Sequence, residues 1–370
     1  MRPPDRLRSP DSPYWCGSPG IEPATDTRYD VSMRSVRALA VFLILLGIAS
    51  FTSVSRPTET LPQQLSDPEY WRMITDFSEA AGYYQYKVVT SNEMTYQNSL
   101  PDLTRAPRAG GAYLGVGPEQ NFTYIAALQP KIAFIFDIRR DMMLEHLMYK
   151  GVFEVSANRV EFVANLFSRK APAQLNADSS VDAIFQAFAR VPADPMLIEQ
   201  NLNALIDRLK TRHHFPLTAE DDRGIRALYR TFSREGVLNF NSSFLSPGYA
   251  TLMTLTDRAG KNWSYLAAKD KYDRIRNMEL QNLIIPLVGD FAGPKAIRAV
   301  AQYLRDHGAT VHVFYISNVE DYIQARSRYV ANIAALPADP SSVLLRWNIG
   351  GNTSFIPITD FVRSQGILRR

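Results

Sequence analysis

The sequence predicts an α/β fold with a doubly wound, mainly parallel sheet of the Rossmann-like type, and three observations lead to this prediction. Strand-like apolar runs alternate with helical patterns from residue 113 towards the C-terminus. A glycine turn joins the first of these strands, 113–116, to the first helix. A long helical block at about 157–235 interrupts the alternation and is too long for one crossover, so we interpret it as an insertion or lid.

The individual elements follow from local patterns. Asp67–Gly82 carries apolar residues at helical spacing, and Pro118 suits the first position of a helix that ends before Pro130. Thr218 and Asp221 form a capping box inside the helical block. The other predicted elements are strands over 132–136, 236–240, 282–290 and 310–317, helical segments over 139–153, 264–280, 294–307 and 318–336, and a C-terminal β-hairpin of strands 342–350 and 353–358.

Composition excludes several classes of function. The chain has 370 residues, of which 46% are hydrophobic and 21% charged, as in an ordinary globular protein with a sizeable core. The net charge is only +4 and no basic run is present, so nucleic acid is not an expected partner. Cys16 is the single cysteine and precedes the predicted folded region, which argues against disulfides, cysteine-based metal sites and a cysteine nucleophile.

The N-terminal part has two distinct compositions. Residues 1–32 are rich in Pro, Ser, Asp and Arg and are predicted to be a disordered extension, with Met33 as the true start of the protein. Residues 33–55 combine a short basic region with an apolar run and are predicted to be a signal peptide or membrane anchor. The remaining domain, 56–370, is then exported or membrane-anchored, and a buried core helix in a cytoplasmic protein is the alternative.

The glycine turn and a following acid have the spacing of a nucleoside-cofactor site. Gly115 and Gly117 permit close approach of a ligand to the backbone, and the next helix offers free N–H groups. Asp137 follows Gly117 by 20 residues at a strand end, where an acid can bind ribose hydroxyls. Gln120 replaces the third glycine of a dinucleotide fingerprint, which favours a cofactor without a diphosphate, such as S-adenosylmethionine. A plain strand-to-helix turn and a helix cap are the alternatives.

Over roughly Tyr113–Ser317, and in the C-terminal hairpin, the sequence resembles class I S-adenosylmethionine-dependent methyltransferases. The resemblance makes "LGVG" the glycine-rich motif, with Gly115 and Gly117, and Asp137 the ribose-binding acid. Tyr113 replaces the acid that usually precedes the first glycine, and Glu93 in "SNE" is our candidate for its role. The sequence around these motifs also resembles a bacterial family of uncharacterised proteins.

Further candidate residues follow the later strands, whose carboxyl ends share one edge of a parallel sheet. Asp290 is our candidate for a general base or a substrate-orienting acid. Asn318 and Glu320 are candidates for substrate binding, although both are also good residues to start a helix. His213 and His214 lack the spacing of a metal site, and no metal is expected.

Three functions remain open from the sequence. The first is a methyltransferase that acts on a small molecule or lipid, and the second is an exported or membrane-tethered binding protein that retains the fold without catalysis. A nicotinamide-dependent oxidoreductase is the third and is disfavoured by Gln120. Export conflicts with the first function, because S-adenosylmethionine is made in the cytosol.

Overall fold

The computed structural model describes residues 59–85, 89–105, 110–234, 242–243, 246–348 and 350–365, and all of them belong to one compact unit, Arg56–Arg370. Three predictions, the disordered extension over 1–32, the signal or anchor over 33–55 and the strand over 236–240, lie outside the described residues.

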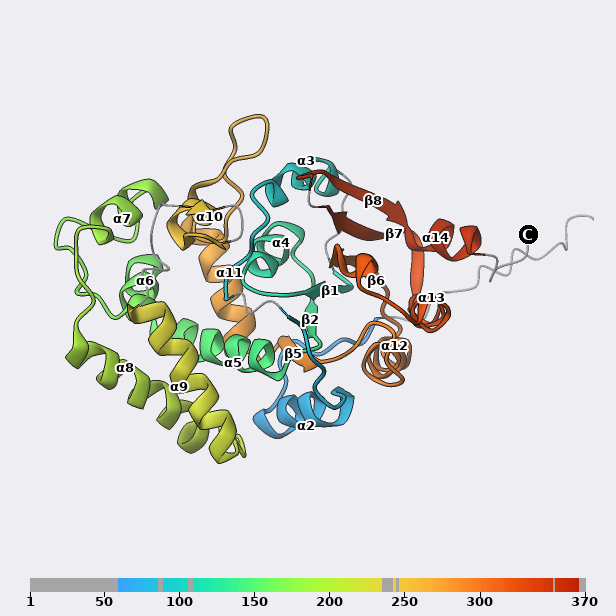
Figure 1. Cartoon of the computed structure of the whole chain (residues 1–370), viewed down its shortest axis with the longest axis horizontal. Coiled ribbons are helices and arrows are strands. Elements are labelled where there is room, and N and C mark those ends of the chain that lie inside the picture. The colour runs from blue at the N-terminus through green and yellow to red at the C-terminus, as the bar shows by residue number, and fades with distance from the viewer. Residues whose placement is uncertain are drawn as a thin grey trace, which may run out of the picture. The chain divides into compact units, whose positions relative to one another are not determined.

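A six-stranded sheet in the order β5-β2-β1-β6-β7-β8 forms the centre of this unit (Figure 1). Its first five strands are parallel neighbours, and β8 runs antiparallel to β7. This order confirms the α/β class with a mainly parallel sheet and is compatible with a Rossmann-like fold. The bounds are β1 (Ala112–Val116), β2 (Ile132–Asp137), β5 (Ile284–Val288), β6 (Val311–Ser317), β7 (Ala338–Trp347) and β8 (Thr353–Pro357), with a separate short pair, β3 (Ser242–Ser243) and β4 (Ser246–Pro247).

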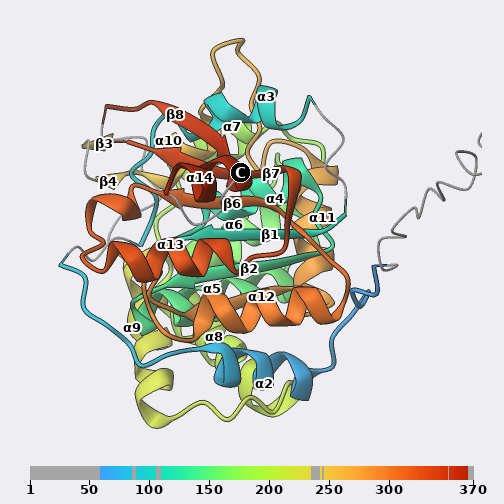
Figure 2. The same ribbon diagram turned by 90° about the vertical axis from the view of Figure 1, so that its right-hand side faces the viewer.

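Helices cover both faces of the sheet, which explains why strands such as β2 are apolar along their whole length. One face carries α4 (Gln120–Leu128), α5 (Arg140–Val155) and α11 (Lys269–Leu280). The other carries α12 (Ala296–Asp306) and α13 (Arg326–Ala334), which lie in front of the sheet in Figure 2. Three further helices are α2 (Asp67–Phe77), which packs beside β5, the short α3 (Leu100–Leu103), and α14 (Ile358–Ser364), which packs on β7 and β8.

The block predicted as an insertion forms helices that pack on α5 and on one another, on the side of α5 away from the sheet (Figure 1). The capping box is confirmed, because the Thr218 hydroxyl accepts the N–H of Asp221 at 3.1 Å and the carboxylate accepts the N–H of Thr218 at 3.0 Å. The helices between α5 and α11 are α6 (Arg159–Phe167), α7 (Val181–Phe188), α8 (Pro195–Asp207), a π-helical turn (Arg208–Arg212), α9 (Ala219–Arg234) and α10 (Tyr249–Thr254).

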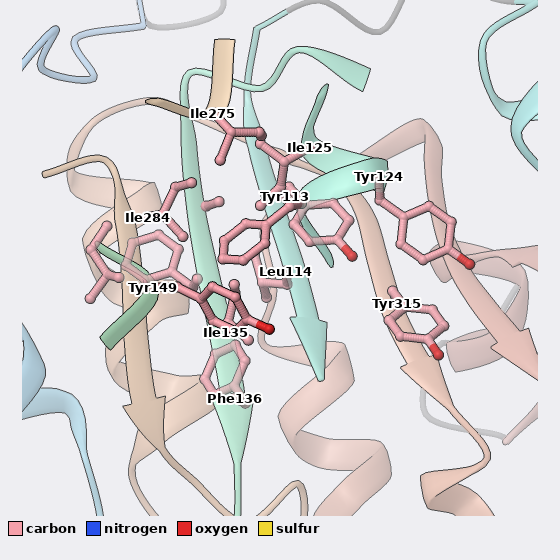
Figure 3. Close-up of a cluster of buried hydrophobic side chains, with 14 of the residues drawn as sticks. Tyr113, Leu114, Tyr124, Ile125, Ile135, Phe136, Tyr149, Ile275, Ile284 and Tyr315 are labelled. Atoms are coloured by element: carbon pink, nitrogen blue, oxygen red, sulfur yellow. The ribbon is translucent and has the colours of Figure 1, made fainter. Parts of the chain in front are cut away.

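The core beneath the glycine turn is unusually rich in tyrosine (Figure 3). The ring of Tyr124 on α4 lies 6.3 Å from that of Tyr113 on β1 and 4.9 Å from that of Tyr315 on β6, measured between centroids. Tyr113 donates to Asn121 at 2.8 Å and Tyr124 to the carbonyl oxygen of Tyr96 at 3.0 Å, so these buried hydroxyls are satisfied. Tyr113, at the position where an acid was expected, is therefore part of the core.

The single helix predicted over 318–336 is wrong, because only its second half is α-helical. The first part is a 3₁₀ turn, Val319–Asp321, followed by a loop that reaches α13. Ser317, the last residue of β6, has a positive φ of 48°, which turns the chain abruptly as the strand ends. The intervening apolar side chains of Val319, Tyr322 and Ile323 line a cavity rather than following a helical period.

Gly115 is required by packing, and replacing it tests how tightly the glycine turn is built. A Cβ at this position would lie 2.0 Å from Oδ1 of Asn121 and 2.8 Å from the ring of Tyr113. We expect Gly115→Ala to lower the free energy of unfolding by about 2 kcal/mol, measured by urea denaturation. Gly350→Ala, where the nearest atom is a flexible side chain at 3.3 Å, is the control and should change it by less than about 1 kcal/mol. Equal effects of the two would contradict this reasoning.

Candidate functional site

A cavity of about 560 Å³ lies at the carboxyl edge of the sheet. Strand order reverses between β1 and β6, and in open α/β sheets ligands bind at such a point. None of the described residues between α5 and α11 lines the cavity, and the helices of this block pack on α5 and on one another. The cavity is lined by residues at the carboxyl ends of five strands or directly after them: Val116, Gly117, Asp137, Gly289, Asp290, Ser317, Asn318 and Trp347.

The glycine turn is held from behind by two buried side chains. The amide nitrogen of Asn121 lies 2.8–3.0 Å from the carbonyl oxygens of three successive residues, Val116–Pro118. His146 Nε2 donates to the carbonyl oxygen of Gly117 at 2.9 Å. The N–H of Gly117 (φ +82°) is bonded to a carbonyl of β2 at 3.3 Å, and Pro118 has no N–H. The turn therefore offers few free donors to a diphosphate.

Asp137 ends β2 and faces the cavity with a side chain that is only 13% exposed. Burial raises the pKa of this carboxyl, and the neighbouring Arg139 guanidinium opposes the shift. Oδ1 accepts the backbone N–H of Arg139 at 2.8 Å and its Nε at 3.4 Å. The carboxylate is thus oriented by its own loop at the edge of the cavity.

Glu93 brings a second carboxyl to the cavity from the loop before the sheet. Its Oε1 accepts hydrogen bonds from the hydroxyls of Tyr315 and, at 2.5 Å, of Ser317, both on β6. Its Oε2 is buried and has no hydrogen-bond partner among the described residues. Burial raises the pKa of this carboxyl to about 7, against the effect of the two hydroxyls. Glu93 is therefore held in place while one oxygen still lacks a partner.

One comparison with known proteins places the chain in a family. A model described as Domain of unknown function (DUF7790) matches residues 88–360, which include all six strands of the central sheet and every residue that lines the cavity except Tyr83 and Tyr84. The chain belongs to this family. No curated protein matches the chain. Among the described residues, no helix has both the length and the apolar character needed to cross a membrane.

Two buried carboxyls beside the glycine turn were not predicted from the sequence. Glu119 is fully buried, and both of its oxygens accept the N–H of Ser91, at 3.1 and 3.2 Å. Burial raises the pKa of Glu119 to about 8. Glu145 on α5 is also buried, and burial raises its pKa well above the usual range. In the sequence Glu119 looks like an ordinary acid of a first helical turn, whereas Glu145 stands in the apolar run "MMLEHLM", which is a usable signal of burial.

The buried Glu119 makes stability depend on pH in a defined direction. Because its folded-state pKa of about 8 exceeds the ordinary value of 4.5 for a glutamate, its contribution to stability is full below the unfolded pKa and is lost as pH rises through the folded one. We expect Glu119→Gln to keep an acceptor for the N–H of Ser91. The variant should have a free energy of unfolding that is higher above about pH 8 by on the order of 2 kcal/mol, and this free energy should fall less steeply as pH rises. Denaturation from about pH 4.5 to above about pH 8 measures both, and an unchanged slope below pH 8 would contradict the assignment.

The other predicted site residues divide between the cavity and an ion-pair network. Asp290 and Asn318 line the cavity, and Oδ1 of Asp290 accepts the N–H of Ala292 at 2.8 Å. Glu320 is not among the lining residues, because its carboxylate is engaged by Arg346 at 2.5 Å and by Arg326 at 3.1 Å. The structure therefore brings together Glu93, Gly117, Asp137, Asp290 and Asn318, and it leaves Gly115 and Glu320 outside the lining of the cavity.

His213 lies far along the chain from these residues and takes part in an ionic network. Its Nδ1 is 2.9 Å from Asp67 on α2, and its Nε2 is 2.7 Å from Glu154 on α5. Both ring nitrogens therefore face carboxylates. The described part of the chain contains no group of His, Cys, Asp and Glu that could hold a metal ion.

Proposed function

We propose that the cavity binds S-adenosylmethionine and that the protein is a methyltransferase acting on a small-molecule or lipid acceptor. In this proposal the fold is of the class I methyltransferase type, including the C-terminal hairpin of that type. One observation carries the proposal. Glu93 lines a cavity that is located where cofactors bind in this kind of sheet, and one of its oxygens is buried without a hydrogen-bond partner among the described residues. A buried polar atom without a partner is rare and favours a ligand that supplies one.

The charge of the ligand follows from the charge of its surroundings. Glu93 has no cationic partner among the described residues, and the ionised form of a buried carboxylate is stabilised by a nearby positive charge. S-adenosylmethionine carries both an ammonium and a sulfonium group. Either would favour ionised Glu93, which would then take the role of the acid that Tyr113 replaces.

The glycine turn and the acid of β2 suit the nucleoside half of the same ligand. Asp137 is positioned to accept hydrogen bonds from ribose hydroxyls, and Gly117 allows the backbone to be approached without a Cβ. The shortage of free N–H groups in the turn disfavours a diphosphate and hence a nicotinamide dinucleotide. The residues present therefore fit S-adenosylmethionine better than NAD.

Transfer requires a base for the proton of the acceptor. When bound, the cofactor supplies an electrophilic methyl group. Asp290 shares the cavity and is the residue that we assign to accept the proton of an acceptor hydroxyl or amine as the new bond to carbon forms and the C–S bond breaks. The backbone N–H of Ala292 fixes its Oδ1, so the carboxylate is oriented before the acceptor binds.

Asp137→Ala tests the ribose assignment. Calorimetric titration of the purified protein should show binding of S-adenosylmethionine and S-adenosylhomocysteine, and the variant should bind both about thirtyfold more weakly, because a hydrogen bond to a charged group is lost. Asp182→Ala, in an exposed position on α7, is the control and should bind as the wild type does. Tighter binding of NAD than of either adenosyl ligand would favour the oxidoreductase instead. Binding without methyl transfer to any acceptor would favour the non-catalytic binding protein.

A further inference from the structure

The cavity has two chemically different halves. The carboxyls of Glu93, Asp137 and Asp290 lie along the part formed by β1, β2, β5 and the loop before the sheet. The remaining part is formed by the segment after β6 and by α13, and it contributes Tyr322, Ile323 and Arg328. Glu93 and Asp137 are assigned to the proposed cofactor and Asp290 to the proton of the acceptor, so none of the three carboxyls accounts for the second half.

Arg328 is the distinctive group of this second half. It lies on α13 with an exposed side chain, and no acidic side chain of the described residues forms an ion pair with it. Arg139, the other arginine that lines the cavity, is engaged by Asp137 and lies 3.6 Å from Asp141. The guanidinium of Arg328 is therefore available to a carboxylate or phosphate, which it can bind through two parallel hydrogen bonds.

The cavity also has aromatic lining residues, two of which are largely open to solvent. Tyr322 is 44% exposed, although it is a large apolar residue that lines the cavity, and the centroid of its ring lies 5.3 Å from that of Tyr84 in a T-shaped arrangement. Tyr83, at the same cavity, is 85% exposed. Trp347 also lines the cavity, and its Nε1 donates to Thr95 at 3.0 Å. Rings of this kind bind flat apolar groups through their faces and edges.

We propose that this half is the acceptor subsite, and that it selects a flat, largely apolar molecule with one anionic group, which Arg328 binds while Tyr322 contacts the apolar body. The proposal rests on the proposed function, because it assigns the other half to the cofactor. The anion can be a carboxylate or a phosphate, since one guanidinium recognises both.

The test uses the purified full chain and four small probes that differ in charge. Isothermal titration with phenylacetate, phenyl phosphate, neutral phenylacetamide and cationic phenethylamine should show that the two anions bind about tenfold more tightly than the other two probes. Whichever anion binds more tightly identifies the headgroup. Arg328→Ala should remove the preference, and Arg328→Lys should keep part of it. Arg190→Ala, which removes an exposed arginine from the insertion, should change nothing.

A second variant examines the aromatic lining residues separately. Tyr322→Ala should weaken phenylacetate about tenfold while leaving the weak binding of acetate unchanged. Three results would each overturn the proposal. They are full retention of the anion preference in Arg328→Ala, equal binding of phenylacetamide and phenylacetate, and no binding of either anion at millimolar concentration. S-adenosylhomocysteine should bind Arg328→Ala as it binds the wild type. Its failure to bind any form would refute the proposed function, whereas the probe series would still report on the anion subsite.

Discussion

Replacing Lys150 with methionine is expected to destabilise the protein by about 4 kcal/mol. Lys150 is fully buried on α5, and its ammonium lies 2.8 Å from Glu154 and donates to the carbonyl oxygen of Glu279 on α11. It also lies 5.1 Å from the centre of the Tyr70 ring on α2. One cation thus joins three helices, and its removal leaves a buried carboxylate with less positive charge around it.

The matched control for Lys150 is a lysine that pairs at the surface. Lys170 lies 3.7 Å from Asp194 with a side chain that is 79% exposed, and Lys170→Met should cost less than about 1 kcal/mol. Chemical denaturation at neutral pH measures both variants. If the two losses were alike, the buried network would contribute no more than a solvated pair, and this account of how α2, α5 and α11 are held together would be wrong.

Replacing Glu93 with glutamine is expected to weaken the binding of S-adenosylmethionine about a hundredfold at mildly alkaline pH. The amide can still accept hydrogen bonds from Tyr315 and Ser317, so the loop should remain in place. What is lost is the negative charge next to the cationic groups of the ligand. Glu220→Gln, on an exposed turn of α9, is the control and should bind as the wild type does.

The pH dependence of binding gives an independent check on Glu93. Because burial raises its pKa to about 7, the carboxyl is largely protonated below this pH and ionised above it. A cationic ligand binds the ionised form, so the affinity of the wild type should rise with pH through about 7 and then level off. Glu93→Gln should show no such rise. Calorimetric titrations at several pH values decide this, and a wild-type affinity that falls with pH would contradict the role of Glu93.

The sheet could be predicted from the sequence because its signals are local. The apolar run Ile132–Phe136 is buried on both faces, and β2 extends it by only one residue, Asp137. The segment over 318–336 could not be predicted, because its composition is compatible with a helix. The positive φ of Ser317 and the placement of Tyr322 and Ile323 in the lining of the cavity are tertiary effects, and they override helical propensity in this segment.

The site could be predicted only in part, for a related reason. Gly117, Asp137 and Asp290 come directly after strands, and parallel strands bring their carboxyl ends to one edge. Glu320 has the same kind of position, but the sequence does not reveal that Arg346, on a neighbouring strand, engages it. The burial of Glu119 likewise depends on the loop of Ser91, which folds over it from 28 residues earlier in the chain.

A crystal structure of the protein grown with saturating S-adenosylhomocysteine tests the central claim most directly, because it shows both whether and where the ligand binds. We predict that the ribose lies against Asp137, that the adenosyl group approaches Gly117, and that the amino group reaches the Glu93 oxygen that now lacks a partner. Ligand bound elsewhere, or a cavity in which Glu93 remains without a partner at saturation, would contradict the account.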